Sequence, residues 1–113
     1  MKMTIVLNEW RDMIVPLALK EGGFVSINAE VYGCWAVHIV TMNDDSRQWA
    51  VSHIPTGLRL TNYPDAATFY DVTPIVKQLQ AKYGAAWNTE NANKVRMLAE
   101  SCKDIWKRDE VTA

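Results

Sequence analysis

The sequence predicts an α+β fold with an N-terminal helix, a three- to four-stranded antiparallel meander, and C-terminal helices packed on one face of the sheet. Apolar residues near the N-terminus recur at helical spacing, and two apolar segments in the middle flank a polar turn. After Tyr63 the helical spacing returns. With 113 residues, 49% of them hydrophobic, the chain suits one domain spanning residues 1–113.

The first predicted element is a helix that begins near Asn8 and ends at Gly22 and Gly23. Pro16 lies inside this span and removes a backbone donor, so we expect a kink or a break there. Residues 3–7 also suit the start of a strand. The apolar residues on the predicted helix face are Val6, Trp10, Met13, Ile14 and Leu17.

The predicted sheet is centred on a hairpin between residues 34 and 60. A short strand over residues 24–27 and a turn within 28–33 precede it, and residues 58–60 suit a brief fourth strand. The turn formers at 43–46 predict an even-length loop, which pairs residues whose numbers sum to 89.

This register assigns the side chains of the hairpin to two faces. One face carries Trp35, Val37, Ile39, Thr41, Gln48, Ala50, Ser52 and Ile54. The other carries Cys34, Ala36, His38, Val40, Met42, Arg47, Trp49, Val51 and His53. We expect the Trp35 face to be core. The mixture of aromatic, basic and titratable groups around Trp49 is typical of a contact surface, so the predicted protein-binding residues are Trp49, His38, His53 and Arg47.

Three helices are predicted after the sheet. Pro64 suits the first position of a short helix that ends near Thr73, and Thr73 and Pro74 suit the start of a second helix that ends at Gly84. Thr89 or Asn91 would cap the last helix. The expected buried residues are Ile75, Val76, Leu79 and Tyr83 in the second helix, and Val95, Leu98, Cys102, Ile105 and Trp106 in the last.

Charge and composition narrow the function classes. The formal net charge of -1 disfavours general affinity for nucleic acid, which requires several cations to neutralise phosphates. No apolar segment is long enough to span a bilayer, and two cysteines make no disulfide framework. We therefore expect a soluble cytoplasmic protein without a cofactor or a membrane partner.

Two alternatives remain open. A nucleic-acid binder would use Arg96, Lys103 and Lys107 on the last helix, and the order α-β-β-β-α resembles that of double-stranded RNA-binding domains. That family's basic cluster after the sheet is missing, because the chain has Tyr63, Pro64, Asp65 and Ala66 there, and its Gly-Pro-x-His loop is missing too.

A small enzyme or metal protein would use Cys34, His38 and His53, which share a predicted face. Cys34 and His38 lie roughly 13 Å apart along one strand, which is too far for ligands of one zinc ion. No phosphate-binding loop and no hydrolase motif is present in the sequence, so we expect no enzymatic activity.

A resemblance points to a function class. The tryptophan-bearing strand that leads into His53-Ile54-Pro55-Thr56-Gly57-Leu58, followed by a small alanine- and aromatic-rich helix, resembles small accessory proteins of phages and mobile elements. These include anti-defence inhibitors such as anti-CRISPRs, and the likeness spans about residues 34–83. It implies a non-enzymatic protein, monomeric or homodimeric, that occupies a surface of a host protein or sequesters a signal molecule.

Overall fold

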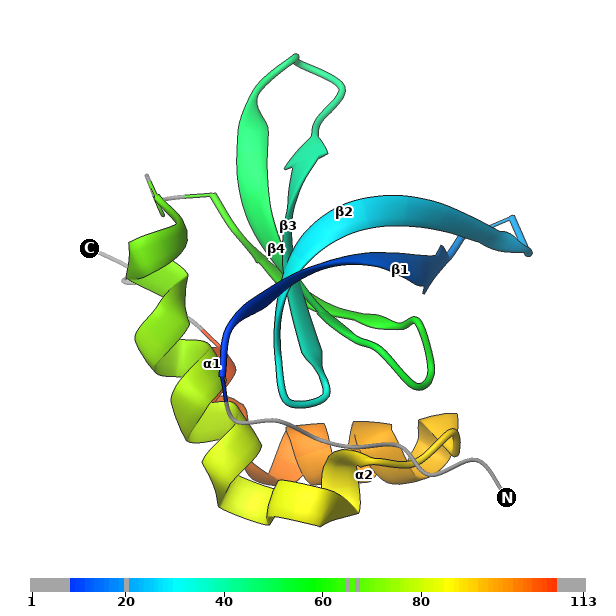
Figure 1. Ribbon diagram of the computed structural model, residues 1–113, viewed down its shortest axis with the longest axis vertical. Coiled ribbons are helices and arrows are strands. Elements are labelled where there is room, and N and C mark those ends of the chain that lie inside the picture. Colours follow the sequence, from blue (N-terminus) through cyan, green and yellow to red (C-terminus); the bar gives the residue numbers. More distant parts are fainter. Residues whose placement is uncertain (1–8, 20, 65, 67, 108–113) are drawn as a thin grey trace.

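The protein folds as an antiparallel sheet followed by helices, which confirms the α+β class (Figure 1). The predicted three- to four-stranded meander is wrong in strand number, because the sheet has five strands. The computed structural model describes residues 9–19, 21–64, 66 and 68–107. The strands pair in sequence order and are β1 (Arg11–Ala18), β2 (Phe24–Tyr32), β3 (Trp35–Thr41), β4 (Arg47–His53) and β5 (Arg59–Tyr63). The helices are α1 (Phe69–Tyr83), the 3-10 turn η1 (Gly84–Trp87), α2 (Ala92–Ser101) and α3 (Lys103–Trp106).

The predicted N-terminal helix is wrong over the described residues, which form β1 instead. Val15 and Leu17 are buried while their neighbours are exposed, and this period of two is that of a strand. Pro16 is compatible with this strand because β1 lies at the edge of the sheet. On the side of an edge strand that has no neighbouring strand, a missing amide donor removes no ladder hydrogen bond. Residues 3–7 lie outside the described residues.

The central hairpin has a register different from the predicted one, because its loop has an odd length. Trp35 pairs with His53 and Thr41 with Arg47, so paired numbers sum to 88 and not 89. Asp45 adopts a left-handed φ of 65°, as expected for a loop of this kind that combines a turn with a bulge. A shift of one residue moves every β4 side chain to the other face. Trp49 therefore shares its face with Trp35.

The sheet is bent and carries a core on each face. The C-terminal end of β1 approaches the loop after β4, where the Ala18 amide donates to the Gly57 carbonyl at 2.9 Å. The inner core of this bend uses mainly small side chains, as a tightly curved sheet requires, and comprises Val15, Leu17, Ala29, Val31 and Ala36. The larger core faces the helices and includes Trp35, Val37, Val51, Tyr63, Val76, Leu79 and Trp87.

Helix α1 is continuous across Pro74, where two helices were predicted. Thr68 and Asp71 form a capping box that starts the helix. Pro74 lacks the amide that would bond to the Tyr70 carbonyl, and the Thr73 hydroxyl donates to that carbonyl at 3.2 Å instead. This local bond replaces the lost one. The predicted end at Gly84 is confirmed.

The predicted last helix is divided at Cys102 into α2 and α3. The predicted cap at Asn91 is confirmed, since its side chain accepts from the Lys94 amide at 3.1 Å. The Trp106 indole of α3 donates back to the Ala99 carbonyl of α2 at 2.9 Å. Among the described residues, no helix is long and apolar enough to cross a membrane.

Candidate functional site

The sheet opens between β2 and β3. Their ladder covers only three pairs, from Glu30 with Val37 to Tyr32 with Trp35. Beyond these pairs the β1–β2 hairpin and the β3–β4 hairpin point in different directions (Figure 1). Residues 24–29 of β2 and 38–41 of β3 therefore have no strand partner on the facing side among the described residues. Alternate residues along these edges direct backbone donors and acceptors toward the opening.

A cleft of about 380 Å³ occupies this opening. Its lining combines apolar, aromatic and carboxyl side chains, and comprises Asp12, Met13, Asn28, Ala29, Glu30, Val37, His38, Ile39 and Trp49. Ile39 is 46% exposed and Met13 is 38% exposed, so both side chains present apolar surface at the cleft. We refer to this site as the hairpin cleft.

A pair of carboxyl groups lies in the hairpin cleft. Asp12 and Glu30 are directly opposite each other on β1 and β2. Hydrogen bonding with Asp12, burial and the negative charge of Asp12 raise the pKa of Glu30. The one salt bridge among the described residues joins Lys103 and Glu100, so neither carboxyl has an ion-pair partner there. The hairpin cleft therefore holds a carboxyl pair without an ion-pair partner among the described residues.

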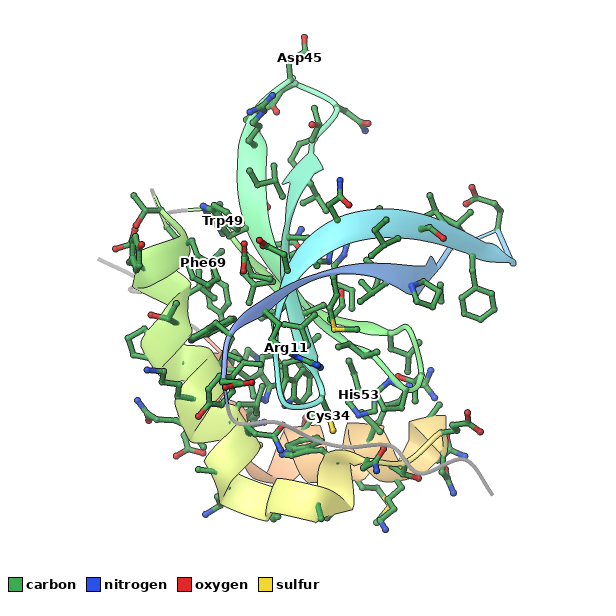
Figure 2. All side chains as sticks on the ribbon, viewed as in Figure 1. Arg11, Cys34, Asp45, Trp49, His53 and Phe69 are labelled. Carbon is green, nitrogen blue, oxygen red and sulfur yellow. The ribbon has the colours of Figure 1, made fainter. Side chains whose placement is uncertain are left out.

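Trp49 forms the aromatic side of the hairpin cleft. It pairs with Ile39 across the β3–β4 ladder and with Tyr63 of β5. Figure 2 shows Trp49 beside Phe69 at the start of α1, and the centroids of the two rings are 6.0 Å apart. The side chain is half-buried. Trp49 thus packs against Phe69 and also lines the cleft.

His38 lines the same cleft although it belongs to the opposite face of the sheet. The two faces meet there because the cleft lies at a strand edge. The His38 Nε2 is 2.9 Å from the Ser52 hydroxyl, and its Nδ1 has no hydrogen-bond partner among the described residues. Burial and the positive charge of Arg59 lower the pKa of His38 to about 4. His38 is therefore neutral near pH 7.

His53 and Arg47 do not join Trp49 and His38. His53 is buried in the helix-facing core, where Nε2 contacts the Trp87 carbonyl at 2.6 Å and Nδ1 the Thr56 hydroxyl at 2.8 Å. Burial lowers the pKa of this histidine. Arg47 is exposed at the outer end of β4. The structure therefore brings together two of the four predicted contact residues.

The shared face predicted for Cys34, His38 and His53 is wrong, because the register places the two histidines on opposite faces. Cys34 is buried at the β2–β3 turn, and burial raises the pKa of its thiol to about 11. A protonated thiol is a poor nucleophile and a poor metal ligand. Within the described residues, no group of three or more His, Cys, Asp and Glu side chains is placed to hold a metal ion.

The basic residues of the nucleic-acid alternative lie near the C-terminal end of the described chain. Arg96 is on α2, Lys103 is on α3, and Lys107 follows α3. Lys103 forms a 2.8 Å salt bridge with Glu100, which offsets part of the positive charge of this surface. All three side chains are exposed.

Sequence reasoning missed Asp12, Glu30 and Ile39 as site residues. Asp12 lay in a predicted helix and Glu30 in a predicted turn, so their pairing across two strands was hidden. The alternation along β1 appears only as burial in the structure, because Met13, Ile14, Val15 and Leu17 are all apolar and show no period of two in the sequence. Comparisons of this chain with protein-family models, with curated proteins and with solved structures found no match.

Proposed function

We propose that this protein is a non-enzymatic binding protein that takes an extended segment of a host protein into the hairpin cleft. The observation that carries the proposal is the pair of unpaired strand edges on either side of a lined cleft. An extended peptide can add a strand to such an edge, where backbone hydrogen bonds give affinity and side-chain pockets give specificity.

The charge of the cleft indicates the chemistry of the bound segment. Asp12 and Glu30 have no ion-pair partner among the described residues, so a Lys or Arg of the partner would complement them. Ile39 lies on the same face as Glu30, because Glu30 pairs with Val37 and Ile39 is two residues along β3 from Val37. An added strand would therefore carry a basic residue two positions from an apolar one.

Trp49 supports recognition of that segment. A half-buried tryptophan beside a carboxyl pair offers both apolar contact area and a ring face for a cation. Capturing a segment that the host protein needs for its own activity would inhibit that protein. This mode agrees with the resemblance of residues 34–83 to phage anti-defence proteins such as anti-CRISPRs.

Selection of peptides tests the proposal. Displayed random decapeptides would be selected on the immobilised protein, and the enriched sequences synthesised and titrated by calorimetry. We expect enriched peptides with a basic residue two positions from an aliphatic or aromatic residue. N-methylation of one alternate set of peptide amides should abolish binding, while methylation of the other set should have little effect, because a strand added to the β3 edge directs only one set toward that edge. Equal tolerance at every amide would contradict strand addition.

Variants of the cleft provide the matched controls. Asp12→Asn with Glu30→Gln should weaken peptide binding up to about fivefold, because an exposed charge pair contributes about 0.2 to 1 kcal/mol. Asp44→Asn with Asp45→Asn removes the same charge from the β3–β4 loop and should have no effect. Identical affinities for the two double variants would argue against recognition by the carboxyl pair.

Alanine variants of Trp49 and Trp35, which share the helix-facing side of the sheet, test peptide binding and stability separately. Trp49→Ala should weaken peptide binding at least about tenfold while the protein remains folded, as for an aromatic hot spot. Trp35 is completely buried, so Trp35→Ala should instead cost about 3 to 5 kcal/mol of unfolding free energy. Chemical denaturation and peptide titration of both variants measure the two effects. The reverse order of effects would show that Trp49 belongs to the core.

A further inference from the structure

The hairpin cleft is closed at one end, where β2 and β3 come together. From Glu30 to Tyr32 the two strands pair directly with each other, and the β2–β3 turn follows. A strand that enters between the two hairpins therefore cannot continue past Glu30 in the plane of the sheet. A segment that pairs with either free edge must end near Glu30 or leave the sheet there.

Packed side chains also close this end on both faces of the sheet. On the helix-facing side, just beyond Glu30, four aromatic rings follow one another with centroids 5.2, 4.7 and 6.0 Å apart. In order, these rings belong to Tyr32, Trp10, Phe69 and Trp49. The residues at this point of the opposite face are all buried, and are Ala29, Val31, Ala36 and His38. A chain end suits this position better than a continuous chain, which would have to cross one of the two packed surfaces.

The free edge of β2 offers backbone donors and acceptors up to the closed end. The Leu19 amide donates to the Gly23 carbonyl at 3.0 Å, so odd-numbered residues of β1 and β2 bond to each other. The even-numbered residues Ser26 and Asn28 therefore direct their backbone groups away from β1 and toward the cleft. An extended chain can bond to these groups until it reaches Glu30, which already pairs with β3.

The charge at the closed end determines which end of a chain fits there. Asp12 lies directly opposite Glu30 across the β1–β2 ladder, and both side chains line the cleft. Neither carboxyl has an ion-pair partner among the described residues. The carboxylate of a C-terminus would be repelled by this pair. The ammonium group of an N-terminus would be attracted and could donate charge-assisted hydrogen bonds.

We infer that the hairpin cleft captures the free N-terminus of its partner protein, with the α-ammonium group against Glu30 and Asp12. This inference rests on the proposed function, and adds which end of the bound segment lies in the cleft and in which direction the segment runs. The first residues of the partner would run outward from the closed end, antiparallel to β2 and parallel to β3. The α-ammonium group and one basic side chain of the segment would together match the two carboxylates in charge.

The α-amino group of a selected peptide tests this inference. The probe is the most strongly enriched decapeptide from a library displayed with free N-termini, synthesised with a free α-amino group or with an N-acetyl group and titrated by calorimetry. We expect acetylation to weaken binding about fivefold at pH 7, the upper value for an exposed charge pair. The affinity of the free-amine form should fall toward that of the acetylated form by about pH 9, because an α-amino group has a pKa of about 8. The acetylated form should show no such fall, because a lysine side chain stays charged at that pH.

Variants of the carboxyl pair show whether the amine lies at the closed end. In the protein with Asp12→Asn and Glu30→Gln, acetylation of the peptide should no longer change the affinity. In the protein with Asp44→Asn and Asp45→Asn, acetylation should keep its full effect. An undiminished effect in the first variant would overturn the inference by placing the amine elsewhere. Equal binding of the two peptide forms to the wild-type protein would overturn it and leave strand addition standing, whereas a selection that enriches no peptide would overturn both.

Discussion

His38 and His53 are buried on opposite faces of the sheet, and both have a pKa below that of an exposed histidine. The unfolded chain therefore binds protons near pH 6.5 that the folded chain does not. Stability from these groups is fully present above the unfolded pKa and is lost as pH falls toward the folded pKa. For His38 that window extends from about pH 6.5 to about pH 4.

We expect the free energy of unfolding to fall by about 1 to 2 kcal/mol between about pH 7 and about pH 5 through His38 alone. Urea denaturation at a series of pH values measures this change. The His38→Gln variant cannot titrate, so its stability should depend less steeply on pH across the same window. Parallel pH profiles for the variant and the wild-type protein would mean that His38 is accessible to protons in the fold.

At the scale of elements, one glutamine joins α1 to the β2–β3 turn. The Gln80 side-chain oxygen accepts from the Cys34 amide at 3.0 Å, and Gln80 is buried. Gly33 lies directly against it: φ is +59°, and a Cβ there would lie 2.4 Å from Gln80 side-chain atoms. Only glycine allows both the left-handed conformation and the close approach. This contact fixes the end of the three-pair β2–β3 ladder on the helix.

Replacing Gly33 should therefore break a contact between elements and not only strain a turn. We expect Gly33→Ala to cost about 2 to 4 kcal/mol of unfolding free energy, from backbone strain and displacement of buried Gln80. Gly23→Ala is the control, because Gly23 also has a positive φ, of +79°, and a Cβ there would have no atom within 4 Å. Its cost should be about 1 kcal/mol. Equal losses in chemical denaturation would assign the whole effect to backbone strain.

For the whole molecule, the divergence of two hairpins produces the hairpin cleft, while the helices stabilise the sheet from one side (Figures 1 and 2). The strand edges in the cleft lack ladder bonds, so local opening there needs less free energy than in the helix-packed centre. We expect cleft-facing amides within residues 38–41 to exchange hydrogen faster than amides of Val37 and Val51. Hydrogen exchange followed by NMR measures the difference.

Binding of a selected peptide provides the control for this exchange prediction. An added strand would protect the cleft-facing amides of residues 38–41, whereas amides bonded to β4 should be unaffected. Uniform protection of the whole sheet on peptide addition would instead indicate a general gain in stability.

Much of the α+β architecture followed from local signals. The polar turn at 43–46, the cap at Asn91 and the glycine end at Gly84 are all features of a few neighbouring residues, and each is present in the structure. Local signals were misleading where the same apolar residues fitted both the period of a helix and the period of a strand. Trp10, Ile14 and Leu17 fit a helical spacing, but Val15 and Leu17 are the buried pair of a strand.

The sequence by itself determined the α+β class, the polar turn at 43–46, the cap at Asn91 and the helix end at Gly84. Only the tertiary structure decided the β3–β4 register, the five-stranded order, the divergence of β2 from β3 and the meeting of Asp12 with Glu30. The physical reason is the separation, along the chain, of the residues whose contacts set each feature. Turns and caps depend on bonds within a few residues, whereas register and strand pairing depend on contacts between segments distant along the chain.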